Sequence, residues 1–258
     1  MQIMGILNAT PDSFSNDGLL DPIELTQQGL SMIEAGADIL DVGGESSRPY
    51  AKPVDPDEEI RRTLPVIKNL INQTDCPISI DSRHSKTITH ALDAGASIIN
   101  DITGFKDPQI VKIAEKYNAK LVLMHMQNQP ENMQVNPVYD DVIDDILNFF
   151  KVRIGLLQNA GIAENRIIID PGIGFGKTLQ HNISIFKNLD RFKLFGYPVL
   201  VGSSRKSFLG KILDVPVDER CEGTLASIAV AYKHHIDIVR VHDVKETKRF
   251  LTVMDSLW

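Results

Sequence analysis

Short runs of apolar residues, rich in isoleucine and valine, recur along the chain, and each run ends in polar residues. The clearest run is Ile167–Ile169, which leads directly to Asp170 and then to the glycine-rich segment Pro171–Lys177. Continuous apolar runs of this length are typical of strands that are buried on both faces, as in parallel sheets. Seven further runs end in the same way, at Asn8, Asp41, Asp81, Asn100, His125, Gly202 and Arg240. The pattern therefore predicts eight buried strands that carry polar side chains at their carboxyl ends.

The segments between the apolar runs have the features of helices. Asp21 can cap a helix, Pro22 suits its first turn, and Glu24 completes a capping box. Gly36 is placed to end the same helix. The other predicted helices cover residues 57–71, 86–94, 108–117, 138–160, 183–192, 219–233 and 245–257. Strands that alternate with helices throughout a chain imply parallel strands joined in βαβ units.

The length of 258 residues suits one large domain, because a (β/α)8 TIM barrel typically needs about 250 residues. No low-complexity segment or change of composition marks a second domain. We therefore predict an α/β protein that is a single (β/α)8 TIM-barrel domain over residues 1–258. Its active site should lie at the C-terminal ends of the strands.

An internal repeat supports this arrangement. Residues 34–41 resemble residues 93–100, and residues 235–240 form a weaker copy. The repeat places Asp41, Asn100 and Arg240 at equivalent points of the second, fourth and eighth predicted strands. Because alternate strands of a barrel share a layer of inward side chains, we expect these three side chains to lie in one layer inside the barrel. For Asp41 we favour pairing with a side chain of a neighbouring strand over contact with a ligand.

The composition is that of an ordinary globular protein, with 43% hydrophobic and 24% charged residues. No segment approaches the roughly 18 consecutive apolar residues of a membrane-spanning helix. The formal net charge of -7 disfavours nonspecific binding to nucleic acid or to anionic membranes. Cys76 and Cys221 form no CxxC pair, and the N-terminus lacks the basic start of a signal peptide. We therefore expect a cytoplasmic protein without a nucleic-acid or membrane partner.

Some of the polar strand ends are suited to a flat, nitrogen-rich ligand. In a closed barrel they would meet at one mouth, where the active sites of TIM barrels lie. Asp81, Asn100 and Asp170 supply carboxylates and an amide at buried positions. A carboxylate can accept two parallel hydrogen bonds from a flat pair of N–H groups. This group of side chains therefore predicts a site for a heterocycle with such an edge.

A second group is suited to an anion. Arg240 and His242 alternate along the last predicted strand, so both side chains point to the same side. Together with Asn8 and Ser47 they can hold a phosphate or a diphosphate. Lys206 follows the seventh apolar run, near a common phosphate-binding corner of barrels. The expected ligand is therefore a heterocycle that carries an anionic tail.

Three other functions fit the sequence less well. Gly172–Thr178 is similar to a Walker A loop, but Pro171 stands where that motif needs its first glycine. His125 has no second histidine at the spacing of a metal site, and the GxSxG motif of serine hydrolases is absent. We therefore expect neither an ATPase, nor a transition-metal site, nor a serine nucleophile.

Five segments of the chain together resemble the dihydropteroate synthase family. They are residues 8–15 (NATPDSFS), 43–49 (GGESSRP), 170–177 (DPGIGFGK), 204–207 (SRKS) and 240–243 (RVHD). They run from the first predicted strand to the last, so the resemblance covers nearly the whole chain. It implies a homodimeric TIM-barrel enzyme of folate biosynthesis, of a family that sulfonamides target. Such an enzyme joins (7,8-dihydropterin-6-yl)methyl diphosphate to 4-aminobenzoate and releases diphosphate and 7,8-dihydropteroate.

The resemblance also implies roles for individual residues. The pterin would be bound by Asp81, Asn100, Asp170 and Lys206. The diphosphate would be bound by Ser47, Arg240, Val241 and His242, with a Mg²⁺ cofactor that Asn8 helps to hold. The aminobenzoate side would be shaped by Phe14, Arg48, Phe175 and Ser207. The catalytic residues would be Asp81, Lys206, Arg240 and His242.

The chain departs from the family pattern in places, and two alternatives stay open. The family usually has threonine at the position of Ser47, and glycine is common at that of Tyr50. A pterin-binding methyltransferase barrel would share the pterin pocket but act on methyltetrahydrofolate with a corrinoid partner. Arg240, His242 and residues 204–206 favour a diphosphate substrate instead. The presence of this diphosphate clamp also counts against a catalytically silent pterin-binding barrel.

Overall fold

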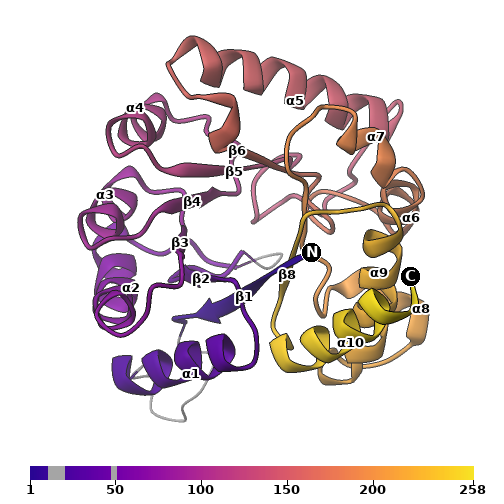
Figure 1. Cartoon of the computed structure of the whole chain (residues 1–258). Helices are drawn as coiled ribbons and strands as arrows, with labels where there is room; N and C mark the ends of the chain where they lie inside the picture. Colours follow the sequence, from indigo (N-terminus) through magenta and orange to yellow (C-terminus); the bar gives the residue numbers. More distant parts are fainter. Residues whose placement is uncertain (11–20, 48–50) are drawn as a thin grey trace.

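The computed structural model of the chain describes residues 1–10, 21–47 and 51–258, so the predicted site residues Phe14 and Arg48 lie outside the described residues. In the described part, eight parallel strands form a barrel inside a layer of helices (Figure 1). The strands are β1 (Gln2–Asn8), β2 (Ile39–Gly43), β3 (Ile78–Asp81), β4 (Ile98–Asp101), β5 (Lys120–Met124), β6 (Ile167–Asp170), β7 (Leu200–Val201) and β8 (Ile238–Val241). The predicted (β/α)8 barrel is confirmed.

Helices follow the strands around the outside of the barrel (Figure 1). They are α1 (Pro22–Glu34), α2 (Pro56–Ile71), α3 (Ser85–Asp93), α4 (Pro108–Lys116), α5 (Val142–Asn159), α6 (Leu179–Lys187), α7 (Leu189–Lys193), α8 (Ser207–Leu213), α9 (Cys221–Lys233) and α10 (Val244–Leu257), with short 3₁₀ helices η2 (Glu164–Arg166) and η3 (Val217–Glu219). Within the described ranges, none of the helices has the length and apolar character needed to cross a membrane.

The strands pair in the order β6-β5-β4-β3-β2-β1-β8-β7, so the first and last strands are neighbours. Between β6 and β7 the ladder is reduced to one bridge, Ile169 with Val199, whose hydrogen bond runs from the Ile169 amide to the Pro198 carbonyl at 2.9 Å. The barrel is therefore nearly closed, and its least-paired junction is the β6–β7 seam.

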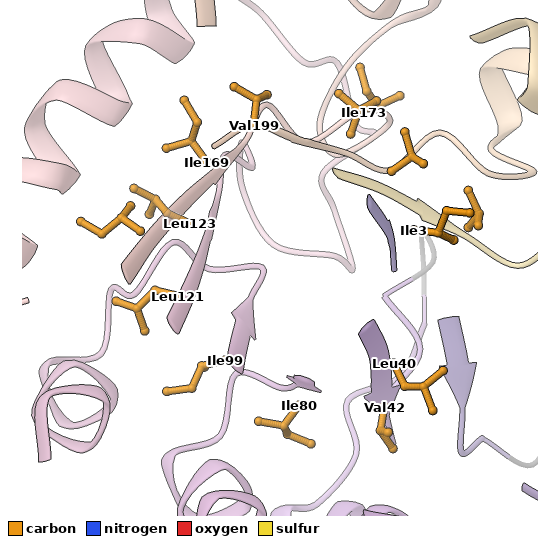
Figure 2. Packing of buried hydrophobic residues seen from close by; sticks show 14 of the residues in the cluster. Ile3, Leu40, Val42, Ile80, Ile99, Leu121, Leu123, Ile169, Ile173 and Val199 are labelled. Carbon is orange, nitrogen blue, oxygen red and sulfur yellow. The ribbon is translucent and has the colours of Figure 1, made fainter. Parts of the chain in front are cut away.

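The strands separate an apolar interior from an apolar outer layer. The lower interior is filled by one residue from each of seven strands: Met4, Ile39, Ile98, Val122, Ile168, Leu200 and Ile238. Residues of the opposite strand faces pack toward the helices, among them Leu40, Ile80, Ile99, Leu121 and Ile169 (Figure 2). Because side chains alternate along a strand, the interior position two residues further on is polar in four strands, at Asp41, Asn100, Asp170 and Arg240.

Most predicted helices are present, and their true ends follow from their caps. Asp21 caps α1 as predicted, by accepting a hydrogen bond from the Ile23 amide at 2.8 Å. Helix α5 begins at Val142, later than predicted, because Asp141 caps it there with two backbone hydrogen bonds of 2.8 and 3.0 Å. Helix α9 begins at Cys221 because the short helix η3 precedes it.

The predicted helix over residues 183–192 is wrong in its extent. The structure has two helices there, and the first begins earlier, at Leu179, behind a capping box formed by Thr178 and His181. The break falls at Asn188, whose backbone is not helical and whose side-chain amide donates to the Ser184 carbonyl at 2.8 Å. Asparagine side chains compete for backbone hydrogen bonds in this way. Helix α8 was not predicted.

Candidate active site

A buried polar layer lies at the C-terminal mouth of the barrel. Asp41 accepts hydrogen bonds from the Asn100 amide at 2.9 Å and from Arg240 Nε at 2.5 Å. Arg240 Nη2 also donates to Asp81 Oδ2 at 2.7 Å. The predicted layer is therefore confirmed. Asp41 does pair with other side chains, as favoured, but they belong to β4 and β8, each two strands away from β2, and not to a neighbouring strand. The second oxygen of Asp41 has no hydrogen-bond partner among the described residues.

One arginine in this layer serves two carboxylates. Burial raises the pKa of Asp81 to about 7, against the opposing charge of Arg240, and the charge of Asp41 adds to the rise. A single guanidinium group cannot neutralise both carboxylates, which fits the raised pKa of Asp81.

Asp170 ends β6 and lies beneath a glycine-rich turn. Its Oδ1 accepts a hydrogen bond from the Gly172 amide at 2.7 Å. Gly172 has a φ of +69°, and a Cβ there would lie 2.0 Å from the His125 carbonyl oxygen, so only glycine fits. Burial raises the pKa of Asp170, while the charges of Lys206 and Lys177 and the Gly172 hydrogen bond oppose that rise.

Lys206 faces Asp170 across the β6–β7 seam. Its ammonium nitrogen lies 4.5 Å from the centroid of the Phe175 ring and donates to the Ile173 carbonyl. Burial lowers the pKa of Lys206 to about 8, although the charge of Asp170 opposes this effect. The structure thus brings the predicted residues Asp170, Phe175 and Lys206 together on one side of the mouth.

An apolar wall that the sequence analysis did not identify adjoins these residues. Its side chains form a separate buried cluster: Ile102, Met124, Met126, Met133 and Phe175. Flat aromatic ligands are bound by apolar walls with a few polar groups, which is the composition found here. The Met124-His125-Met126 run at the end of β5 is the sequence signal for this wall, because both methionines belong to the cluster.

Two of the predicted anion-binding residues, Asn8 and His242, lie at the ends of the paired strands β1 and β8. Asn8 ends β1 and is half-buried, and His242 directly follows β8. The His242 ring nitrogen Nδ1 lies 3.0 Å from the Ser204 hydroxyl, which also accepts a hydrogen bond from the His242 amide at 3.1 Å. Val241 packs in the outer core between barrel and helices. Any contact of Val241 with a ligand at the mouth is therefore limited to its backbone.

Ser47 and Ser207 complete the predicted set in the described residues. Ser47 lines a small pocket together with Glu45, Glu59, Asp81, Ser82, Arg83 and Ile102. Ser207 is the first residue of α8, immediately after Lys206. The structure therefore places Ser47 beside Asp81 and Ser207 beside Lys206.

A cluster of charges, which we call the loop bridge, joins three loops of the mouth and was missed from the sequence. Arg83 Nη2 lies 2.8 Å from a Glu45 oxygen and 3.4 Å from a Glu131 oxygen. His84 Nε2 lies 3.3 Å from the other Glu45 oxygen. The loop bridge thus connects the loops after β2, β3 and β5. Charged loop residues carry no periodic signal, so the sequence did not reveal the bridge.

Among the described residues of the mouth, Asn8 has a side chain suited to Mg²⁺. No group of three or more histidine, cysteine, aspartate or glutamate residues that could hold a metal occurs within residues 1–10, 21–47 and 51–258. Asn8 supplies an amide oxygen, which is the hard donor type that Mg²⁺ prefers, whereas Asp41 and Asp81 are engaged by Arg240. Mg²⁺ at Asn8 would fit only together with oxygens of a bound phosphate.

Comparisons with known proteins agree with this geometry. Residues 4–242 match the family described as pterin binding enzymes. The dihydropteroate synthase of Clostridium beijerinckii is 46% identical over 258 residues, which cover 99% of this chain and 93% of that protein. The dihydropteroate synthase of Haemophilus influenzae is 44% identical over 256 residues, with 99% and 93% coverage.

The chain is also similar to solved structures of dihydropteroate synthases. Dihydropteroate synthase of Yersinia pestis with a sulfonamide drug complex superposes with a TM-score of 0.95 at 42% identity, covering 99% of this chain and 93% of that chain. The Xanthomonas albilineans enzyme in complex with 7,8-dihydropteroate superposes with a TM-score of 0.90 at 36% identity, with the same coverage. The chain therefore belongs to the family of pterin-binding enzymes and is a dihydropteroate synthase of folate biosynthesis.

Proposed function

We propose that the chain joins (7,8-dihydropterin-6-yl)methyl diphosphate to 4-aminobenzoate, with the chemistry carried out by the residues of the barrel mouth. The observation that carries this proposal is that a carboxylate and several cations meet at one mouth: a Cβ on Gly202 would lie 3.7 Å from Arg240 Cβ and 3.8 Å from Lys206 Nζ, and Ser204 of the Lys206 loop bonds to His242. Asp170 offers an acceptor for a flat N–H edge, and Arg240 and His242 offer donors for an anion.

The pterin would lie against Asp170, Asn100, Lys206 and the apolar wall. The Asp170 carboxylate would accept two parallel hydrogen bonds from the pterin N–H edge. Asn100 already donates its amide to Asp41, which fixes the orientation of the side chain and directs its oxygen away from Asp41. Phe175, from the loop after β6, would close the ring-binding side.

The diphosphate would lie near Asn8, Ser47, Arg240 and His242, and the Val241 contribution would come from its backbone. Bound Mg²⁺ would supply charge neutralisation for the leaving diphosphate at Asn8. Arg240 and His242 would donate to phosphate oxygens, and their effect would be largest as negative charge accumulates on the departing group.

The reaction would proceed by loss of the leaving group and capture of the resulting cation. The C–O bond breaks and its electron pair leaves with the diphosphate, which gives a cation delocalised into the dihydropterin. Asp81, when ionised, would stabilise that cation. The aromatic amine then forms the C–N bond and loses a proton. Exclusion of water would fall to the loops that carry Phe14, Arg48 and Ser207, which would also shape the aminobenzoate site.

An assay of diphosphate release tests the proposed function directly. With both substrates and Mg²⁺, we expect diphosphate and 7,8-dihydropteroate in equal amounts, and little release when 4-aminobenzoate is omitted. Methyl transfer from methyltetrahydrofolate to a corrinoid partner, without diphosphate release, would favour the methyltransferase alternative.

We propose further, from the family resemblance, that the enzyme is a homodimer of the cytoplasm that uses small-molecule substrates alone. Size-exclusion chromatography with light scattering tests the oligomeric state: the mass should be twice that of the 28.7 kDa chain. Cell fractionation tests the location.

A further inference from the structure

Lys177 is a buried lysine to which the proposed chemistry gives no role. It ends the loop after β6, and 3% of its surface is exposed. Its Nζ lies 2.9 Å from the Phe175 carbonyl, 3.3 Å from the His125 carbonyl and 3.1 Å from His125 Nδ1. An ammonium group has three N–H donors, and these three acceptors match them one for one.

The imidazole of His125 fits this arrangement as an acceptor. His125 is 7% exposed and packs edge-to-face on Phe149, with ring centroids 5.0 Å apart. Burial lowers the pKa of His125 to about 2, and the charge of Lys177 acts in the same direction, so the ring is neutral. Acceptance of a hydrogen bond at Nδ1 leaves the ring proton on Nε2.

Lys177 also lies next to the turn that holds Asp170. A Cβ placed on Gly172 would lie 3.4 Å from Lys177 Nζ, so the turn runs directly over the ammonium group. Gly172 in turn donates its amide to the Asp170 carboxylate at 2.7 Å. Burial lowers the pKa of Lys177 well below its ordinary value, while the charge of Asp170 opposes that effect, as expected for two groups of opposite charge.

Three cations face the Asp170 carboxylate. Lys177 belongs to its own loop, Lys206 to the loop after β7, and Arg240 to β8. Arg240 is already paired with Asp41 and Asp81. Lys206, the hydrogen bond from the Gly172 amide and Lys177, in that order, therefore offset the burial of Asp170.

We propose that Lys177 is a positioning residue for pterin recognition, which keeps Asp170 ionised and fixes Phe175 and His125 from beneath the loop. This inference rests on the proposed contact between Asp170 and the pterin. Lys177 holds the Phe175 carbonyl while the Phe175 ring lies against Lys206. One buried ammonium group thus stabilises the charge of the Asp170 carboxylate and fixes the position of the Phe175 backbone.

The test compares Lys177→Met, which removes the charge, with Lys177→Arg, which keeps it. Binding of 6-hydroxymethyl-7,8-dihydropterin is measured by calorimetry at about pH 6 and about pH 8, because each unit of pKa shift changes the ionised fraction of Asp170 about tenfold below that pKa. Loss of the Lys177 charge raises the pKa of Asp170, so the methionine variant should lose more affinity at the lower pH than at the higher pH. The arginine variant should show little extra loss at the lower pH.

Asp170→Asn separates this inference from the proposed function. If Asp170→Asn weakens pterin binding at both pH values but Lys177→Met changes affinity equally at both, Lys177 is only a packing residue and the inference is overturned alone. If Asp170→Asn leaves the affinity unchanged, the proposed contact fails and the inference fails with it. Melting temperatures measured in parallel show how far each variant is destabilised.

A measurement on the unaltered enzyme covers the case in which the variants do not fold. Nitrogen-15 NMR of the histidine rings, with His125 assigned through its contact with the Phe149 ring 5.0 Å away, should show a neutral ring protonated at Nε2. A ring protonated at Nδ1 would make Lys177 a neutral amine that accepts the hydrogen bond. That result would overturn the inference, because such an amine carries no charge for Asp170.

Discussion

Arg240 lies between two aspartates at the barrel mouth, and this placement gives one side chain two tasks. It compensates the buried charge of Asp41, which is fully buried, and it is the proposed donor to the leaving diphosphate. Removal of one partner of a buried ion pair is costly because the other charge stays buried. Substitution of Arg240 alone therefore mixes an effect on stability with an effect on catalysis.

Arg240→Met should lower the free energy of unfolding by about 3–5 kcal/mol, because Asp41 is left uncompensated. It should also lower kcat/KM by about 10²-fold or more, since a donor to the departing group is lost. Adding Asp41→Asn to Arg240→Met removes the stranded charge and should recover most of the stability but none of the activity. Urea unfolding and diphosphate release measure the two effects, and recovery of activity in the double variant would contradict the catalytic role.

The pKa of Asp81 predicts a pH dependence near neutrality. Burial raises it from 3.8 to about 7, so Asp81 is largely protonated below pH 7 in the folded enzyme. Because the ionised form is the one proposed to stabilise the cation, kcat/KM should rise as the pH increases through about 7. Asp81→Asn should be less active and lack this rise, and a rise of equal size in the variant would assign it to another group.

The same pKa has a consequence for stability. A carboxyl group whose pKa is raised on folding favours the folded state below its unfolded pKa of 3.8, and this contribution is lost as the pH rises through about 7. The stability of the wild type should therefore fall relative to Asp81→Asn over this interval. Urea unfolding of both proteins across the interval measures the difference, and parallel curves would contradict the raised pKa.

Asp170→Asn should weaken pterin binding by about 1–3 kcal/mol, because an amide replaces one acceptor by a donor that faces the pterin N–H edge. The fold should be preserved, since the remaining oxygen can still accept from the Gly172 amide. Calorimetry with the pterin and a thermal melt measure the two quantities. Unchanged affinity would remove Asp170 from the site.

The strands of the barrel could be predicted from the sequence more fully than the helices and loops. The strands were predictable because each is a run of β-branched residues with a polar end, and the layer of Asp41, Asn100 and Arg240 followed from an internal repeat. Helix α8 and the break at Asn188 could not be predicted from the sequence. Short helices in the outer layer depend more on tertiary contacts than on the spacing of apolar residues. Lys177 gave no signal either, since its burial exists only once the loop after β6 has folded over it.

The two ion pairs of Arg83 in the loop bridge should differ in strength. Arg83 and Glu45 expose 16% and 10% of their side chains, whereas Glu131 exposes 38%. A more exposed pair contributes less, because water screens it. Arg83→Gln should therefore raise the KM for 4-aminobenzoate several-fold with little change in kcat, because Glu45 then holds less firmly the loop after β2, whose sequence includes the proposed aminobenzoate residue Arg48. The matched Glu131→Gln should have an effect below about twofold. Equal effects of the two variants would contradict this order.

The barrel as a whole has its least-paired junction where the pterin side of the site lies. Asp170 and Lys206 belong to opposite sides of the β6–β7 seam, which has a single bridge. Regions with few backbone hydrogen bonds open most readily. A ligand that contacts both sides should therefore close the seam.

Hydrogen exchange tests this expectation. Backbone amides of β6 and β7 should exchange faster than those of β2 and β3 in the empty enzyme, and pteroic acid should slow the exchange of β6 and β7 most. Uniform protection around the barrel, or uniform slowing by the ligand, would contradict the expectation.

The contact between Arg240 and Asp41 joins positions 199 residues apart, and it has a consequence for how the chain folds. Contacts between distant parts of a chain form slowly, because the loop entropy is lost before the contact stabilises anything. During synthesis the N-terminal strands emerge first, so Asp41 has no arginine partner until β8, which carries Arg240, leaves the ribosome. Closure of the barrel before that point would bury a bare carboxylate. The polar layer thus opposes premature compaction, and the nascent chain should remain open, and dependent on protection from aggregation, until nearly all of it has been made.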